Sequence, residues 1–78
     1  MKIYILESIV DGSQYVGMSG NLLRRIKEHN SGKVKSTKSK RPWKIIYTEE
    51  YDTFAEARKR EIYLKSSAGR RFRKYMGP

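Results

Sequence analysis

Residues 14–29, QYVGMSGNLLRRIKEH, are the part of the sequence around which the fold and the chemistry are organised. A short β-forming run is followed by glycines and then by an amphipathic segment, which predicts a strand, a turn and a helix. The stretch also holds Tyr15, Arg25 and His29 at fixed offsets. Because the chain has one histidine and no cysteine, this is an unusual concentration of reactive side chains.

The residues before this stretch predict its partner strand. Residues 2–9 alternate β-forming side chains, and the Asp-Gly pair at 11–12 is typical of a two-residue hairpin turn. We therefore predict an antiparallel hairpin of residues 2–9 with residues 14–18.

The turn also predicts the register of this hairpin. With two central turn residues, Ser8 would face Tyr15 and Leu6 would face Gly17. Directly opposed side chains share one face of a sheet, so Tyr4 and Tyr15 are expected on the same surface. Their backbones would lie about 13 Å apart along the strands.

The helix that follows has clear start and stop signals. Ser19 or Asn21 can cap it, it is expected to run to about Asn30, and Gly32 is placed to terminate it. Arg25 lies on the edge of the stripe that would dock on the sheet. That stripe contains Leu22, Ile26 and His29. The other charged side chains are expected in solvent, namely Arg24, Lys27 and Glu28.

A basic segment without acidic residues connects this helix to the next strand. Its cations are Lys33, Lys35, Lys38, Lys40, Arg41 and Lys44. We interpret residues 33–44 as a mobile loop. It is either a solvated connection or a contact surface for a phosphate backbone, since so much like charge repels itself unless an anion offsets it.

Two further elements are predicted after the loop. Residues 43–51 alternate again and predict a third strand, with Trp43, Ile45 and Tyr47 on one face. Thr53 begins a capping box that opens a second helix, expected to reach about Ser66.

Glu61 interrupts the apolar stripe of this second helix. The stripe otherwise contains Phe54, Ala57 and Leu64. A carboxylate on a docking face costs several kcal/mol unless it is paired or binds a metal. Glu61 is therefore either paired with an arginine or is a metal ligand aimed at the tyrosines.

The basic tail, residues 70–78, predicts a short third helix. We expect it to pack Phe72 and Tyr75 and to expose its cations, which are Arg70, Arg71, Arg73 and Lys74.

Composition limits the classes of protein that fit. The chain has 78 residues, which predicts one small domain over residues 1–78. Eighteen Lys and Arg against eight Asp and Glu give a net charge of +10, which favours nucleic acid as a partner, ahead of an anionic membrane surface. No segment resembles a membrane span or a signal peptide, so a cytoplasmic location is expected.

The reactive residues suit phosphodiester cleavage, and neither a Gly-x-Ser-x-Gly elbow nor a Walker phosphate loop is present. Glu61 is a candidate ligand for one hard cation such as Mg2+, and Arg25 is a candidate for holding the scissile phosphate. Tyr15 is the first candidate for the base that deprotonates the attacking water, and His29 is the second. His29 and Tyr4 can equally be structural residues of the core.

Five short motifs recur in the order found in the GIY-YIG endonuclease domain: Ile3-Tyr4-Ile5, Tyr15-Val16-Gly17, Asn21-Leu22-x-x-Arg25, His29-Asn30 and Glu56-Ala57-x-x-x-Glu61. Over residues 2–65 the chain resembles this family. It is most similar to the small stand-alone bacterial members related to the amino-terminal nuclease module of the excision-repair incision subunit. It departs from the family at Lys2, where the first motif has glycine, and at Val16, where the second has isoleucine.

The resemblance implies an α+β fold, with a three-stranded antiparallel sheet flanked by about three helices. It also implies one divalent metal, Mg2+ or Mn2+, held by Glu61, with Tyr15 and Arg25 acting at the phosphate. Tyr4 matches the tyrosine of the first motif, and His29 matches a position often occupied by His or Tyr, so both are candidate catalytic residues beside Tyr15 and Arg25.

We therefore expect a metal-dependent endonuclease that nicks DNA, with DNA repair as its context. No base-reading module accompanies the domain, so it should select structure, single strands or ends rather than sequence. Phosphate contacts are expected from residues 33–44 and 70–74. The alternatives are a nucleic-acid-binding module with little turnover, or a nuclease subunit that requires a partner protein.

Overall fold

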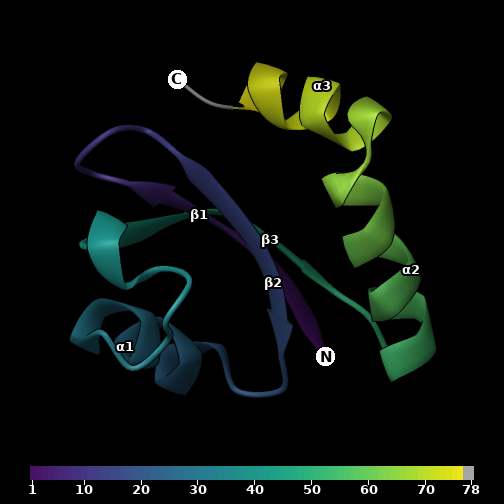
Figure 1. The fold of residues 1–78 in the computed structure, drawn as a ribbon. Helices are drawn as coiled ribbons and strands as arrows, with labels where there is room; N and C mark the ends of the chain where they lie inside the picture. Colours follow the sequence, from purple (N-terminus) through teal and green to yellow (C-terminus); the bar gives the residue numbers. More distant parts are fainter. Residues whose placement is uncertain (77–78) are drawn as a thin grey trace.

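A computed structural model describes residues 1–76 as a three-stranded antiparallel sheet with helices on both faces (Figure 1). The elements are, in chain order, β1 (Lys2–Ser8), β2 (Gln14–Ser19), α1 (Leu22–Ser31), the 3-10 helix η1 (Lys38–Lys40), β3 (Trp43–Glu50), α2 (Phe54–Lys65) and α3 (Ser67–Met76). The strand order is β2-β1-β3, so β1 is central and β2 lies at an edge. The predicted α+β fold class is confirmed.

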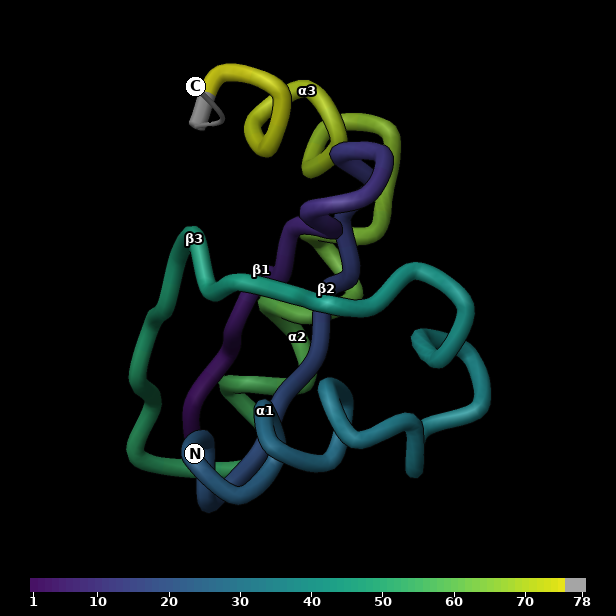
Figure 2. Tube along the Cα trace, turned by 90° about the vertical axis from the view of Figure 1, so that its left-hand side faces the viewer, coloured from purple at the N-terminus to yellow at the C-terminus, as the bar shows by residue number. Residues whose placement is uncertain are grey.

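The helices divide between the two faces of the sheet. Figure 2, seen from the α1 side, shows α1 and the segment after it in front of the strands and α2 behind them. The start of β2 lies near α3, since the Gln14 side chain donates to the Arg73 carbonyl at 3.5 Å. None of the helices in the described part of the chain combines the length and apolar character needed to cross a membrane.

The predicted hairpin is confirmed, but its predicted register is wrong by two residues. Tyr15 lies opposite Leu6, and Gly17 lies opposite Tyr4. A shift of two preserves the face of every side chain, so the two tyrosines share a surface as expected. They are also closer than expected, because two residues rather than four now separate them along the strands, or about 7 Å.

The turn explains the error in register. The loop contains four residues, 9–12, rather than two. It is closed by the Ser8 amide, which donates to the Ser13 carbonyl at 2.8 Å, and by the Gly12 amide, which donates to the Ser8 carbonyl at 2.9 Å. Gly12 has a φ of 77°, a conformation that glycine adopts without steric cost.

A β-bulge reverses the faces along β3. Tyr47 pairs with Ile5, but Ile45 pairs with Leu6, so one extra residue of β3 lies between the two pairs. The prediction that Trp43, Ile45 and Tyr47 share one face is therefore wrong. Tyr47 packs on the α2 side of the sheet, whereas Trp43 packs on the α1 side.

Each face of the sheet has its own core. The core on the α2 side consists of Ile3, Ile5, Val16, Ala57 and Leu64. The core on the α1 side consists of Tyr4, Leu6 and Trp43, with Tyr15, Leu22 and Ile26 packed against it. Phe54 was expected in the docking stripe of α2 but is 60% exposed. It is the first residue of the helix, where the chain enters from the exposed turn before it.

The capping signals of α1 and α2 are confirmed. The Asn21 side chain accepts a hydrogen bond from the Arg24 amide at 3.1 Å, and Gly32 ends α1 with a φ of 85°. The Thr53 hydroxyl accepts from the Glu56 amide at 3.2 Å. These contacts satisfy backbone groups that a helix end would otherwise leave unpaired.

Residues 33–42 form a loop of turns that includes η1, and Trp43 begins β3. Thr37 is completely buried, and the Trp43 indole donates to its carbonyl at 2.8 Å. η1 follows directly, and the Arg41 guanidinium donates to the Lys38 carbonyl at 2.9 Å. The cations of this segment are therefore displayed from a defined backbone.

The predicted third helix is confirmed as α3, but two of its side chains are not where we expected them. Phe72 packs on Tyr47 with ring centroids 5.9 Å apart, whereas Tyr75 is 87% exposed rather than packed. Arg73 is half-buried rather than exposed. Residues 77 and 78 of the predicted tail lie outside the described residues.

Candidate active site at the edge of the sheet

The site begins with Tyr4, which reaches from the central strand across the edge strand. A Cβ atom at Gly17, the residue opposite, would lie 2.4 Å from the Tyr4 hydroxyl oxygen. Any side chain at this position would therefore displace the phenol. The glycine of the Tyr15-Val16-Gly17 motif provides the space that brings the Tyr4 hydroxyl to the edge of β2.

Four aromatic rings surround this position. The ring centroid of Tyr15 lies 6.5 Å from that of Tyr4, 4.9 Å from that of His29 and 6.4 Å from that of Trp43. Tyr4 and His29 are completely or almost completely buried, whereas Tyr15 is half-buried. Tyr15 is therefore the phenol that a solvent molecule or a substrate can reach first.

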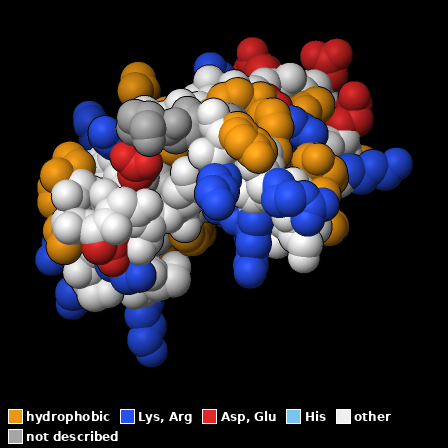
Figure 3. Space-filling model, turned by 90° about the horizontal axis from the view of Figure 1, so that it is seen from above, with side chains coloured by type: hydrophobic (Ala, Val, Ile, Leu, Met, Phe, Trp, Pro, Cys, Tyr) orange, Lys and Arg blue, Asp and Glu red, His pale blue; other side chains and the backbone are white. Residues whose placement is uncertain are grey.

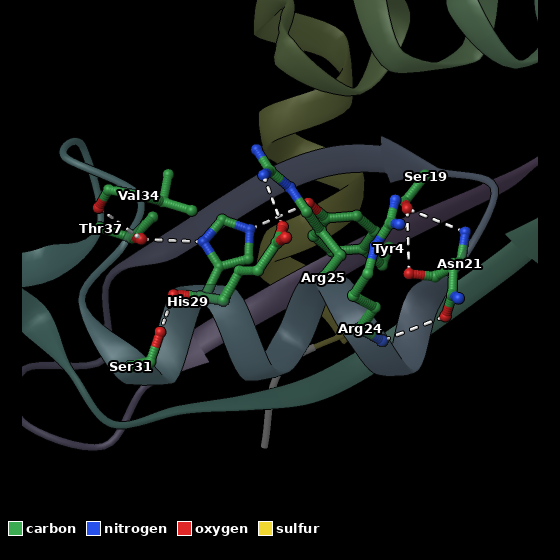
Figure 4. A network of polar contacts seen from close by, with 10 residues as sticks. Tyr4, Ser19, Asn21, Arg24, Arg25, His29, Ser31, Val34 and Thr37 are labelled. Atoms are coloured by element: carbon green, nitrogen blue, oxygen red, sulfur yellow. Dashed lines mark hydrogen bonds and ion pairs between the residues drawn. The ribbon is translucent and has the colours of Figure 1, made fainter.

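A chain of hydrogen bonds runs from Tyr4 into the folded basic segment (Figure 4). His29 Nε2 lies 3.0 Å from the Tyr4 hydroxyl, and His29 Nδ1 lies 2.8 Å from the Thr37 hydroxyl. The Thr37 hydroxyl in turn donates to the Val34 carbonyl at 3.3 Å.

The contact between Thr37 and Val34 favours one direction for the protons of this chain. When the Thr37 hydroxyl donates to the Val34 carbonyl, it accepts from His29 Nδ1–H. The neutral imidazole then has a free lone pair on Nε2, and the Tyr4 hydroxyl donates to it. The lone pairs of the Tyr4 oxygen consequently remain free to accept other donors.

Burial keeps both partners of this hydrogen bond neutral. It lowers the pKa of His29 below its ordinary 6.5, and the Arg25 charge lowers it further. Burial also raises the pKa of Tyr4, against the opposing effect of the Arg25 guanidinium, and the nearby Glu61 carboxylate raises it further. Both groups are thus uncharged at neutral pH.

Arg25 is the cation of the site. Its side chain is 36% exposed, and Nη1 lies 3.0 Å from Glu28 Oε1. Glu28 and then Tyr4 raise the pKa of Arg25, so the guanidinium faces both the helix surface and the phenols. The expectation that Glu28 lies free in solvent is wrong, because it is half-buried against Arg25, whereas Arg24 and Lys27 are exposed as expected.

Glu61 approaches the same edge from the other side of the sheet. It is 8% exposed on α2, and its charge acts on the Tyr4 hydroxyl. Its oxygens pair with Arg58 at 2.7 Å and with Lys65 at 3.2 Å. The structure thus shows the paired carboxylate that we considered as one alternative for this position.

The donor set fits a cation that takes most of its ligands from water and substrate. Within residues 1–76 no three His, Cys, Asp or Glu side chains gather to hold a metal, so Glu61 would supply a single carboxylate. Its two ion-pair partners, Arg58 and Lys65, are about half exposed and can therefore swing into solvent. A hard cation of the Mg2+ type accepts such a site.

Most of the predicted phosphate-contact residues lie at the surface. All six cations of residues 33–44 are exposed. Lys40 lies 3.5 Å from Asp11, and Lys44 lies 3.5 Å from Glu7. Arg70 and Arg71 are also exposed.

Two residues that position the site were not identified from the sequence as doing so. Thr37 stands in a basic, serine-rich segment, and nothing in its spacing separates it from its neighbours. Asn30, to which we gave no specific contact, bridges α1 and β3. Its side chain accepts from the Trp43 amide at 2.7 Å and donates to the Trp43 carbonyl at 3.1 Å.

Comparison with known proteins places the chain among small bacterial proteins. The family described as the GIY-YIG catalytic domain matches residues 1–76. The UPF0213 protein of Staphylococcus saprophyticus is 43% identical over 65 residues, which cover 82% of this chain and 78% of that protein. The UPF0213 protein of Bacillus licheniformis is 38% identical over 74 residues, covering 94% and 75% of the two chains.

A solved structure of another UPF0213 protein is similar to this chain in fold and sequence. The solution NMR structure of the UPF0213 protein of Bacillus halodurans superposes with a TM-score of 0.58 at 35% identity, covering 95% of this chain and 79% of that one.

Proposed function

Since the chain belongs to the GIY-YIG catalytic domain family, we propose that it is a metal-dependent endonuclease that hydrolyses phosphodiester bonds in DNA. One observation supports this most strongly. The Tyr4 and Tyr15 rings lie 6.5 Å apart at the edge strand, on the face covered by α1, which carries Arg25. Tyr15 shares the lining of one cavity with Lys65, whose ammonium lies 3.2 Å from the Glu61 carboxylate on α2. A cation, a carboxylate and two phenols thus converge at one edge.

Each residue then has a distinct role. Arg25 holds the non-bridging oxygens of the scissile phosphate and stabilises the charge that develops on them. Tyr15 acts as the base in its phenolate form and takes a proton from the attacking water. The water oxygen forms the new bond to phosphorus as the bond to the leaving oxygen breaks, and a solvent water protonates the leaving oxygen. His29 is completely buried and therefore contacts neither the phosphate nor the attacking water. Its role is to position the Tyr4 hydroxyl by accepting a hydrogen bond from it.

The carboxylate of Glu61 would hold a Mg2+ or Mn2+ ion. Such an ion would supply Lewis-acid stabilisation of phosphate charge. Before it binds, Glu61 keeps its two ion pairs with Arg58 and Lys65, which compensate a largely buried charge.

The charge of the protein favours a nucleic-acid substrate. The net charge of +10 and the exposed cations of residues 33–44 favour a polyanionic strand. Phosphate contacts position a strand without reading its bases. We therefore propose selection of DNA structure, such as branches, flaps or single strands, rather than of sequence.

A second candidate function is a nucleic-acid-binding module without turnover. One observation favours it, since the ion pairs of Glu61 with Arg58 and Lys65 compensate this carboxylate without a metal. In that case Glu61 would be a structural residue only.

Cleavage by Glu61→Gln separates the two candidates. Supercoiled plasmid and a flapped oligonucleotide duplex are incubated with Mg2+ or Mn2+, or with chelator. Glu50→Gln, at the exposed end of β3, is the control for the loss of one negative charge. The nuclease proposal expects cutting by wild type and Glu50→Gln only, and none with chelator. Cutting that persists in Glu61→Gln, or salt-sensitive binding by all three proteins without any cutting, contradicts it.

A further inference from the structure

A polar cavity adjoins the candidate active site on the same edge of the sheet. It has a volume of about 290 Å³ and lies between β2 and the junction of α2 with α3. Its walls are formed by Gln14, Tyr15, Val16, Lys65, Arg70 and Arg73. Half of these residues are cations and none is a carboxylate. We refer to it as the α3 cavity.

Arg73 is held in place within this cavity. Its Nε donates to the Leu64 carbonyl at 3.0 Å, and its Nη1 lies 3.3 Å from the Gln14 side-chain oxygen. Gln14 in turn donates to the Arg73 carbonyl at 3.5 Å. The guanidinium is therefore fixed by neutral partners, which leaves its charge uncompensated.

The positive charge of the cavity has little internal compensation. Within the described residues neither Arg70 nor Arg73 forms an ion pair with an acidic side chain. Burial lowers the pKa of Arg73, and the like charge of Arg70, which lines the same cavity, lowers it further. Figure 3, seen from above, shows Lys and Arg side chains projecting around most of the outline, with acidic side chains at the upper right and at the left. An anion in the cavity would offset the like charges of Arg70 and Arg73.

The cavity is connected to the candidate site through two residues. Tyr15 lines the cavity and also contacts the aromatic cluster of the site. Lys65 lines the cavity, and its ammonium lies 3.2 Å from Glu61 Oε2. Lys65 follows Glu61 by one helical turn, or about 5.4 Å along α2. An anion bound here would therefore be a close neighbour of a phosphate held at Glu61 and Arg25.

We propose that the α3 cavity is a subsite for a backbone phosphate of the nucleic-acid strand, next to the phosphate that is cleaved. Arg70 and Arg73 would be its charged ligands, since guanidinium groups bind phosphate oxygens in a fixed geometry. Lys65 would lie between the two phosphates. This assignment rests on the proposed function for the identity of the strand, but its test does not need cleavage.

The first measurement compares the binding of Arg70→Gln with that of wild type. Affinity for a fluorescent single-stranded oligonucleotide is measured by anisotropy across a range of salt, without metal, so that nothing is cut. The matched control is Lys59→Gln, which removes one exposed positive charge from α2 outside the cavity. We expect Arg70→Gln to weaken binding about tenfold. The slope of log affinity against log salt concentration should fall by about one, the value for one lost phosphate contact. Lys59→Gln should change neither the affinity nor the slope measurably.

The second measurement locates the phosphate. Oligonucleotides carry one neutral methylphosphonate linkage at successive positions, and each is bound to wild type and to Arg70→Gln. The subsite predicts one position at which the neutral linkage removes the difference between the two proteins. Equal losses for Arg70→Gln and Lys59→Gln, or a difference that no single linkage removes, would show a diffuse charged surface and overturn the subsite.

These outcomes remain separate from those of the proposed function. A protein that binds through Arg70 as described but never cuts contradicts the nuclease and leaves the subsite intact. A protein that cuts, but in which Arg70→Gln behaves like Lys59→Gln, contradicts the subsite alone.

Discussion

The two faces of this sheet are built from alternate residues of the same strands, yet they differ in kind. On the α2 side, the residues contributed by β1 are Ile3 and Ile5, which pack in an apolar core. On the α1 side, β1 contributes Tyr4 and Leu6, and Tyr4 leads into a chain of polar contacts that ends on the backbone at Val34.

The difference shows how a domain of 78 residues can hold a reactive site. The apolar face supplies burial, which is the main source of stability. The polar face places neutral, fully hydrogen-bonded groups at the edge strand, and among the described residues no buried side-chain nitrogen or oxygen lacks a partner. Changes on the polar face should therefore affect cleavage, with or without a loss of stability, whereas changes on the apolar face should affect stability alone.

Arg25→Lys is expected to have the largest effect on cleavage. Lysine keeps the charge but cannot bind phosphate oxygens in a bidentate geometry, so the single-turnover rate should fall about 10²- to 10³-fold. Arg24→Lys, one residue earlier and exposed, is the matched control and should cut like wild type. Equal rates for the two variants would show that Arg25 contributes only charge.

Gly17→Ala tests the path of Tyr4 over the edge strand. The new methyl group would lie 2.4 Å from the Tyr4 hydroxyl, so the phenol must move away from His29. We expect about a 10²-fold loss of cleavage and about 1–3 kcal/mol less free energy of unfolding. At Gly20 nothing lies within 4 Å of the position that a methyl group would occupy, so Gly20→Ala should change the free energy of unfolding by less than about 0.5 kcal/mol.

Thr37→Val removes the acceptor of the His29 Nδ1 proton without changing the size of the side chain. The buried N–H would be left unpaired, which costs about 1–3 kcal/mol of stability, and cleavage should fall about tenfold. Nitrogen-15 NMR should find the Nδ1-protonated tautomer in wild type and Thr37→Ser but a mixture in Thr37→Val. An unchanged tautomer in Thr37→Val would remove the positioning role assigned to Thr37.

The smallest expected effect is a pH dependence of stability set by His29. Its pKa in the folded protein lies below its ordinary 6.5 because of burial, so below pH 6.5 the unfolded chain binds a proton that the folded chain does not. The free energy of unfolding should therefore fall as the pH drops from about 6.5 toward 5. Urea titrations across this range should lose the dependence in His29→Gln, and a pH-independent wild type would contradict the assignment.

Much of this arrangement was predictable because side-chain periodicity survives local errors. The hairpin loop has four residues rather than the two that an Asp-Gly pair suggests, but an even shift keeps Tyr4 and Tyr15 on one face. Glu61 was identified because a carboxylate in an apolar stripe is a local contradiction, and it is indeed largely buried. Both predictions depend only on the spacing of side chains along one strand or one helix.

The remainder depends on contacts between segments that are distant in the sequence. The burial of Thr37 requires His29 on α1 and Trp43 on β3 to surround it, which no local pattern encodes. The bulge in β3 arises from its pairing with β1 and reverses the face of Tyr47. Arg73 is half-buried because Gln14 and the end of α2 receive its guanidinium.

The division between the two faces is tested most directly by one pair of variants. Tyr15→Phe removes only a hydroxyl from the polar face, and Ile5→Val removes only a methylene from the apolar face. Single-turnover cleavage and urea unfolding are measured for both at the same temperature. We predict that Tyr15→Phe cuts at least about 10²-fold more slowly with unchanged unfolding, and that Ile5→Val cuts like wild type but loses about 0.5–1.5 kcal/mol of stability. Wild-type cleavage by Tyr15→Phe would contradict the account.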